Sequence, residues 1–387
     1  MHLLTSPIQP YAWGSHASIA TLQGRSAPTE MPEAELWLGA HPLAPSRLED
    51  GNSLDKAISV RPEWLGAYTR KRFSRLPFLL KVLAADSALS IQAHPSLDQA
   101  SEGFARENAA GIPLTAPFRN YKDDNHKPEL ICALSPFEAL CGFRHPKELA
   151  ILFDLLNAEP FASWARVLRS APADVALKEL FTASMALDRA ARARAIDVAV
   201  SGSPRLREHG LEFVRVAEWV ANLANLYPVD AGVLSVLFLN YVSLEPGQAI
   251  YLSSGKLHAY LKGTGIEVMA NSDNVLRGGL TPKHVDVSEL TRVLQFSPDD
   301  VAIMRPDSGI ESTYKTEAPE FELSRVAIDG VWSGHSRGPE VLLSVEGSFT
   351  TQGGEVLASG FGAFVPDGEP FELRGKGILF RVKVPGA

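Results

Sequence analysis

The period at which apolar residues recur changes twice along this chain of 387 residues, and the changes divide it into an outer frame and an insert. In residues 36–143 the apolar runs are short and bounded by turn residues, which is typical of β-strands. In residues 146–226 apolar side chains recur every three to four positions, which indicates helices. Strand-like runs return at 233–239 and continue to the C-terminus. The sequence therefore predicts a β-rich frame with an inserted helical domain.

The last hundred residues show short strand-like runs at regular, turn-bounded spacing. This spacing predicts a sandwich or jelly roll of strands at the C-terminal end of the chain. Its closing segment, residues 353–368, is rich in Gly and contains no histidine. We therefore expect a structural domain without a metal.

Composition excludes several classes of protein. The two cysteines, Cys132 and Cys141, are too few for a disulfide framework and favour a reduced, cytoplasmic protein. No apolar stretch approaches the ~20 residues of a membrane helix, and the first residues lack an export signal. A net charge of -8 argues against a nucleic-acid surface. We expect neither nucleic acid nor membrane as a partner, and local cations for any anionic ligand.

Three segments carry side chains of the kinds that bind metals. Because side chains alternate along a strand, Gln92 and His94 share one face of their segment. Glu129 opens an apolar run, where a carboxylate is costly unless it is paired or metal-bound. His258 follows a Pro-Gly turn, a strand and a second turn, a spacing that resembles the second half of the cupin motif, with Ser253 in place of its proline. Two imidazoles, one carboxylate and one amide suit a divalent metal such as Zn²⁺.

Seven motifs lie at residues 11–14, 34–42, 76–83, 89–95, 121–129, 255–260 and 271–283. Together they resemble the type I mannose-6-phosphate isomerase family, and the resemblance covers most of the chain. The resemblance implies two cupin-type jelly-roll β-barrels with an inserted α-helical domain. It also implies one Zn²⁺ per chain, a small sugar phosphate as substrate and a monomer. The implied activity is a zinc-dependent aldose–ketose isomerase acting on mannose 6-phosphate and fructose 6-phosphate. The corresponding domains are a catalytic domain of residues 1–145 with 229–290, the insert 146–228, and a C-terminal domain of 291–387. Some N-terminal strands of the first domain could pair with the C-terminal barrel.

The resemblance also implies roles for individual residues. The family's metal ligands fall on Gln92, His94, Glu129 and His258, and its active-site arginine falls on Arg277. The remaining residues expected near the substrate are Trp13, Lys81, Ser90, His126, Lys127, Tyr260, Glu267, Asp273 and Lys283.

Moving a carbonyl between two carbons requires a base and stabilisation of enediolate charge. Lys127 and His126 are both candidate bases, and the sequence does not rank them. Asp273 is a further candidate for handling a proton or orienting a hydroxyl. Arg277 and Lys283 are the cations nearest two paired glycines, and Arg277 could face either the phosphate or the enediolate.

Two other functions remain open from the sequence. An iron-dependent cupin oxygenase would use a similar ligand set but usually a facial triad. A sugar-sensing cupin would bind a ligand without moving a proton. In the insert, Arg189 and Arg192 share a helix face, which we interpret as solvated surface rather than an anion site.

Overall fold

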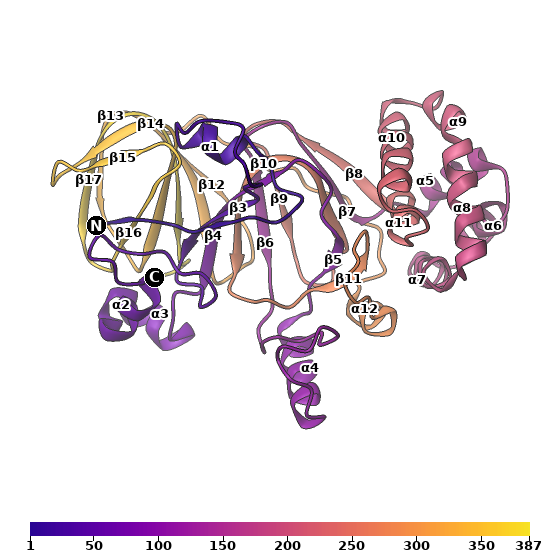
Figure 1. Cartoon of the computed structure of the whole chain (residues 1–387), viewed down its shortest axis with the longest axis horizontal. Helices are drawn as coiled ribbons and strands as arrows, with labels where there is room; N and C mark the ends of the chain where they lie inside the picture. The colour runs from indigo at the N-terminus through magenta and orange to yellow at the C-terminus, as the bar shows by residue number, and fades with distance from the viewer.

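Two antiparallel sheets and a group of helices lie in a row in the computed structural model, which describes residues 1–387 (Figure 1). The smaller sheet is at one end together with both termini, the larger sheet is in the middle, and the helices of the insert are at the other end. Helices occupy about as much of the chain as strands, but the sheets form the body of the molecule. No helix is long and apolar enough to cross a membrane.

The larger sheet has ten strands, joined as β11-β5-β10-β4-β3-β2 with β6 and β7 also paired to β10. Its long central strand β10 contacts four others, so residues far apart in the sequence meet along it. The strands are β2 (Ile8–Gln9), β3 (Glu35–Gly39), β4 (Phe78–Ala85), β5 (Ile91–Ala93), β6 (Glu129–Ala133), β7 (Phe137–Phe143), β8 (Leu239–Leu244), β9 (Ala249–Leu252), β10 (His258–Ala270) and β11 (Leu276–Gly279).

The smaller sheet has seven strands in the order β1-β16-β14-β17-β13-β12, with β15 on β14. The first strand of the chain pairs with β16, so the N-terminus is part of the C-terminal sheet. The strands are β1 (His2–Leu4), β12 (Glu311–Tyr314), β13 (Glu322–His335), β14 (Glu340–Thr351), β15 (Val356–Ala358), β16 (Gly362–Val365) and β17 (Pro370–Lys383).

A core of 29 buried residues joins the two sheets, and alternation along β4 explains how it forms. Phe78, Leu80 and Val82 point into this shared core. Lys81, between them, points to the opposite face of the sheet, where a pocket opens. Because both faces of the strand are covered, its sequence reads as an almost continuous apolar run. Lys81 is the one charged residue in this run, and it lies on the face of the sheet where the pocket opens.

The insert consists of six consecutive helices and packs with a seventh around a core of 42 buried residues. They are α5 (Pro146–Leu156), α6 (Phe161–Ser170), α7 (Ala173–Ala186), α8 (Arg189–Ser201), α9 (Ser203–Arg207), α10 (Leu211–Leu226) and α11 (Gly232–Phe238).

The strand predicted at 233–239 is wrong, because residues 233–238 belong to helix α11 and only Leu239 lies in a strand, β8. All seven residues of α11 are buried, so apolar side chains surround the helix on every face. Such a run has no periodicity that separates a buried helix from a buried strand. The strand expected at 88–91 begins only at Ile91.

Besides α11, six helical segments outside the insert were not predicted. The sequence did contain a signal for α4, because Ser96 and Gln99 have the spacing of a capping box. In the structure the Ser96 side chain accepts the backbone N–H of Gln99, and the Gln99 side chain accepts the backbone N–H of Ser96. The segments are α1 (Ser18–Leu22), α2 (Leu54–Val60), η1 (Pro62–Leu65), α3 (Gly66–Phe73), α4 (Leu97–Ala109) and α12 (Val287–Val293).

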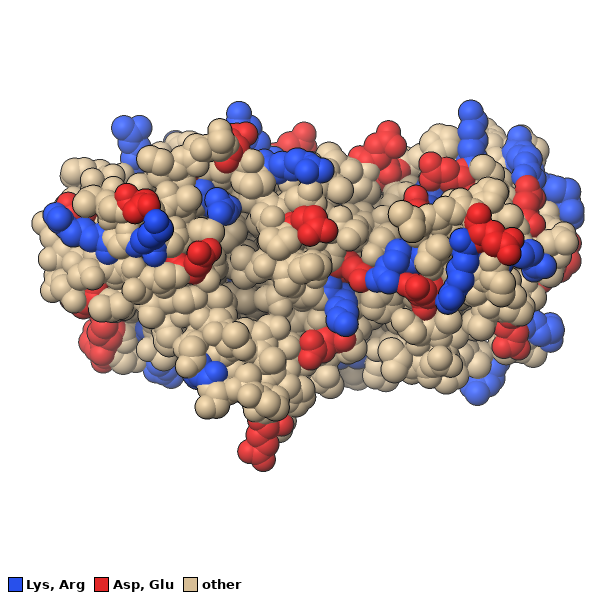
Figure 2. Space-filling view, turned by 90° about the horizontal axis from the view of Figure 1, so that it is seen from above, with Lys and Arg blue, Asp and Glu red and all other residues tan.

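The surface carries both signs of charge. On the face seen in Figure 2, lysine and arginine side chains are interspersed with aspartate and glutamate, and no large patch of one sign forms. An extended basic surface of the kind that binds nucleic acid is therefore missing from this face.

Candidate metal centre and active site

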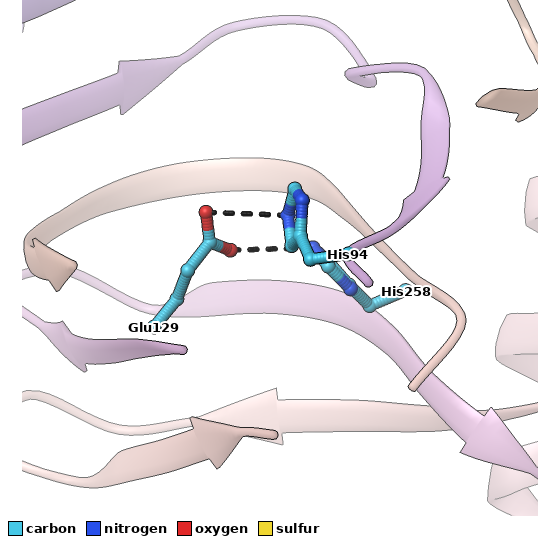
Figure 3. A group of neighbouring side chains, drawn as sticks. All are labelled: His94, Glu129 and His258. Carbon is cyan, nitrogen blue, oxygen red and sulfur yellow. Dashed lines mark ion pairs between the residues drawn. The ribbon is translucent and has the colours of Figure 1, made fainter. Parts of the chain in front are cut away.

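Three strand ends bring two histidines and a glutamate together inside the larger sheet (Figure 3). His94 follows β5, Glu129 begins β6 and His258 begins β10. The Glu129 carboxylate faces both rings from one side, with His94 Nε2 3.3 Å from Oε1 and His258 Nε2 3.3 Å from Oε2. The side chains are at most 2% exposed, so water does not compensate the carboxylate.

The hydrogen bonds of the two rings fix which nitrogens face the carboxylate. His94 Nδ1 donates to the Asn274 carbonyl at 2.7 Å, and His258 Nδ1 donates to the Lys256 carbonyl at 3.0 Å. Burial lowers the pKa of His94 to about 4, so this ring is neutral at pH 7. Its Nε2 then presents a lone pair to a carboxylate oxygen, and neither His94 Nε2 nor Glu129 Oε2 has a hydrogen-bond partner. Acceptors that face each other in a buried site require a cation between them.

The spacing of the cluster fits zinc. Ligand atoms 2.0–2.1 Å from zinc at tetrahedral angles lie about 3.3 Å from one another. Gln92 pairs directly with His258 across β5 and β10, and its amide nitrogen is 3.4 Å from His258 Nε2. A half-turn of the amide places its oxygen there instead. Gln92, His94, Glu129 and His258 therefore form a suitable set of four ligands.

Lys127 is the nearest cation to this cluster. Its Nζ is 3.0 Å from Glu129 Oε1. Burial by itself would raise the pKa of Glu129, but the charge of the neighbouring Lys127 opposes burial, and the pKa of Glu129 lies well below its usual range. Glu129 is therefore a carboxylate, the form that binds a metal.

A cavity of about 600 Å³ opens beside the cluster. Gln92 and Glu129 reach its wall, whereas His94 and His258 do not. His126, one of the two candidate bases, also lies outside the lining, and its Nε2 is 2.9 Å from Glu320 Oε1. The other predicted site residues all line the cavity: Trp13, Lys81, Ser90, Lys127, Tyr260, Glu267, Asp273, Arg277 and Lys283.

A buried triad of charges forms one wall of the cavity. Lys81 lies opposite Glu267 across β4 and β10, and its Nζ is 2.9 Å from Glu267 Oε2 and 3.4 Å from Glu35 Oε1. Burial would lower the pKa of Lys81, but the two carboxylates raise it instead. Burial raises the pKa of Glu267, and Lys81 opposes this effect. Lys81 therefore remains charged and compensates the negative charge of the Glu35 and Glu267 carboxylates.

The opposite wall carries cations without partners. Arg277 pairs with Gln92 across β11 and β5, so the two side chains share a face next to the metal cluster. Arg277 is half-buried, and burial lowers its pKa. The side chains of Arg277 and the exposed Lys283 make no ion pair or hydrogen bond. The cavity thus offers two positive charges that are free to bind an anionic ligand.

Comparisons with known proteins agree with this geometry. Residues 1–146 match the family model of the type I phosphomannose isomerase catalytic domain. Mannose-6-phosphate isomerase from Escherichia coli is 38% identical over 99% of both chains, and the protein of that name from Bos taurus is 32% identical over 90% of this chain and 88% of its own. The chain belongs to the type I mannose-6-phosphate isomerase family.

Solved structures of the isomerase family have the same fold. The Salmonella typhimurium mannose 6-phosphate isomerase bound to fructose 6-phosphate and zinc is 38% identical, covers 99% of both chains and superposes with a TM-score of 0.90. A zinc-bound mannose 6-phosphate isomerase is 37% identical with the same coverage and TM-score. The family therefore includes zinc-bound members with this architecture.

Two residues of the site in this family member escaped the prediction although they lie in a recognised motif. Glu35 and Trp37 line the cavity from β3, and Trp37 Nε1 donates to Glu35 Oε2 at 2.7 Å. Leu36 and Leu38 alternate with them and face the shared core. The argument that identified Glu129, a carboxylate in an apolar strand, also applies to Glu35.

His41 is a third residue that the prediction missed. It is 3% exposed, its ring lies edge-on to Trp37, and its Nε2 is 3.7 Å from Asp273 Oδ1. Burial lowers the pKa of His41, and Asp273 opposes that shift. His41 follows β3 in a loop, so the period of a strand could not place its side chain in the cavity.

Proposed function

We propose that this chain interconverts mannose 6-phosphate and fructose 6-phosphate through an enediolate, with one zinc ion per chain. The observation that carries the proposal is the His94–Glu129–His258 cluster, which opens into a cavity with two unpaired cations. Relatives of the same family bear that activity in their names, and one was solved with fructose 6-phosphate and zinc. An iron-dependent oxygenase has no comparable use for the unpaired cations.

The residues that hold the zinc ion would be Gln92, His94, Glu129 and His258. Zinc bound there would supply Lewis-acid stabilisation of negative charge on the substrate oxygens. The carbonyl acceptors of His94 and His258 fix both rings with Nε2 directed at the site. The buried Lys81 triad keeps the neighbouring wall rigid, so the polar groups there need no rearrangement during the reaction.

Lys127 is our candidate for proton transfer. The reaction removes the proton from C2 of the aldose, leaves the electron pair in the enediolate, moves the hydroxyl proton from O2 to O1, and returns a proton to C1, so that the carbonyl is then at C2. The Lys127 amine lines the cavity beside Glu129, within reach of a sugar bound there. His126 points to Glu320 and away from the cavity, which favours Lys127 of the two candidate bases. Asp273, at the exposed mouth beside His41, is placed to orient a hydroxyl.

The two cations divide the anionic groups of the substrate between them. Arg277 lies opposite the ligand Gln92, so we assign it to the sugar oxygens that gain charge. Lys283 lies farther out in the same wall, and we assign it to the phosphate. Trp13, Ser90, Tyr260 and Glu267 complete the cavity around the sugar. The Tyr260 hydroxyl is buried without a partner and is available to a substrate hydroxyl.

The finer description of the fold is also a proposal. Each sheet body would be a cupin-type jelly roll, with a catalytic domain formed by residues 1–145 and 229–290, a helical insert at 146–228 and a C-terminal domain at 291–387. We further propose a cytoplasmic monomer whose partner is the sugar phosphate, with no nucleic acid or membrane partner.

The test is isomerisation by purified, zinc-loaded protein in deuterated water. We expect mannose 6-phosphate to give fructose 6-phosphate, with deuterium at the carbon beside the carbonyl. Gln92→Ala should lower the zinc content, whereas Lys127→Ala and Arg277→Ala should retain zinc and lose activity. Binding without exchange would contradict the proposal and support a sugar sensor, and oxygen consumption would support an oxygenase.

A further inference from the structure

The turn that follows β11 lies between the two unpaired cations, and its backbone contributes to where both of them lie. Arg277 precedes the turn and Lys283 follows it, and neither side chain is held by a protein partner. No carboxylate anchors either side chain, so the positions of the two cations depend on the backbone. The pairing of β11 with β5 holds the backbone of Arg277 on one side, and whatever fixes the turn holds it on the other. The contacts of the turn therefore help to position the charges that face the substrate.

A single carboxylate oxygen fixes the turn from the end of the helical insert. Asp230 Oδ1 accepts the backbone N–H of Leu280 at 2.9 Å and that of Gly232 at 2.7 Å. The two backbones touch at this point, because a Cβ atom on Gly279 would lie 2.5 Å from the nitrogen of Gly232. We call residues 229–232 and 278–280 the clasp.

The clasp is held in an unfavourable backbone conformation, which requires strong local support. Val229 has φ +66° and Leu280 has φ +54°, the left-handed region that branched or bulky side chains avoid. The insert supplies part of that support. Arg192 of α8 donates to the Val229 carbonyl at 3.5 Å, and also to the carbonyls of Met185 and Leu187. The interpretation of Arg192 as solvated surface is therefore wrong.

We infer that Asp230 is a positioning residue, which connects the helical insert to Arg277 and Lys283 and thereby sets the affinity for the sugar phosphate. This inference rests on the proposed function for the identity of the ligand. The Asp230 carboxylate hydrogen-bonds only backbone groups of the clasp, and Asp230 does not line the substrate cavity. Its effect on substrate must therefore pass through the turn.

The test compares three variants of the full, zinc-loaded chain. Asp230→Ala removes both acceptor contacts, whereas Asp230→Asn keeps an oxygen in the same place. Asp188→Ala is the matched control, because Asp188 Oδ1 accepts the Ala191 amide at 2.8 Å and caps α8 in the insert without touching the clasp. Calorimetry measures the affinity for fructose 6-phosphate, kinetics measure KM and kcat, and hydrogen exchange measures the backbone of residues 276–283.

Asp230→Ala should weaken fructose 6-phosphate binding roughly tenfold, the loss expected for two backbone hydrogen bonds. It should also raise KM more than it lowers kcat and speed hydrogen exchange in the turn, with zinc content unchanged. Asp230→Asn should restore binding to near the wild-type value. Asp188→Ala should lower thermal stability without a change in affinity.

A double-mutant cycle separates positioning from general damage. If Asp230 acts through Arg277, Asp230→Ala should weaken binding much less in an Arg277→Ala background than in the wild type. Additive losses, or an Asp230→Ala affinity equal to that of Asp188→Ala, would overturn the inference while the proposed function stands. If the wild-type chain neither binds nor isomerises the sugar phosphates, the proposed function fails. In that case the rate of hydrogen exchange in residues 276–283 still tests the role of Asp230. If Asp230→Ala leaves this rate unchanged, the inference about Asp230 is overturned as well.

Discussion

The two sheets share one core and differ on the faces that point away from it. Each contributes strands to the 29-residue core between them, with Val82 from the larger sheet and Val341 from the smaller one. The other face of the smaller sheet encloses a second core of ten apolar residues. The other face of the larger sheet also has an apolar core, of twelve residues, but beside it Lys81, Glu267 and Glu129 face a cavity of about 600 Å³.

This difference shows that the architecture does not by itself create the site. In β14 of the smaller sheet, Leu342 occupies a position between two core residues, as Lys81 does in β4 of the larger sheet. Leu342 adds an apolar side chain to the second core of the smaller sheet. Lys81 instead places a charge on the corresponding face of the larger sheet, and this buried charge must be paired with carboxylates. Function follows from the few polar side chains on one face.

Substitution of a metal ligand in the larger sheet should have the largest effect on zinc content and activity, and no residue of the smaller sheet should have a comparable effect. His94→Ala removes one of four ligands, and we expect zinc loss and an activity at least about a thousand-fold lower, because metal stabilisation is worth several kcal/mol. Metal analysis and steady-state assays measure the two effects. His209→Ala, an exposed histidine in the insert, is the control and should keep one zinc per chain. A second stoichiometric zinc in the wild type would contradict a metal-free smaller sheet.

A buried ion pair in each sheet allows a matched comparison. Lys81→Met leaves the Glu35 and Glu267 carboxylates buried and uncompensated, and should cost about 3–5 kcal/mol of unfolding free energy. Arg381→Met in the smaller sheet leaves Glu340 alone, and its lost contacts at 2.5 and 2.7 Å should cost a similar amount. Denaturant unfolding measures both losses. Only the first variant should also lose activity at a temperature where both remain folded.

The core of the smaller sheet should affect stability alone. Phe349 is fully buried there, and Phe349→Ala should lower the free energy of unfolding by about 3–5 kcal/mol through the cavity it leaves. Unfolding curves measure that loss. The values of KM and kcat well below the transition should match those of the wild type. A selective rise in KM would mean that the smaller sheet helps to shape the cavity.

Strand alternation made much of this site predictable from the sequence. The period of two placed Gln92 beside the cavity and Glu267 on the pocket face of β10, and it could have placed Glu35 in the same way. The pairing of Arg277 with Gln92 was not predictable, because a register between distant strands depends on the tertiary fold. Resemblance to a family supplied Arg277 instead.

Features that depend on tertiary packing escaped the sequence. Helix α11 is buried on all faces, so its apolar run carried no helical period. His126 and Lys127 are neighbours with similar chemistry, and only the fold directs the lysine to the cavity and the histidine to Glu320. Asp230 gave no signal either, because its role is to accept the backbone N–H of Leu280, fifty residues away.

The smallest predicted effect concerns backbone strain next to the larger sheet, where Leu280 directly follows β11. The non-glycine residues with positive φ are Ser74, Asn157, Val229 and Leu280, and none lies in the smaller sheet. Val229→Gly removes a branched side chain from the left-handed region and should stabilise the protein by about 1 kcal/mol, because the relief of strain exceeds the entropy cost of glycine. Thermal unfolding measures the gain. A loss of stability would mean that contacts of the valine side chain outweigh the strain, and a higher KM would mean that a stiff Val229 helps Asp230 hold the turn.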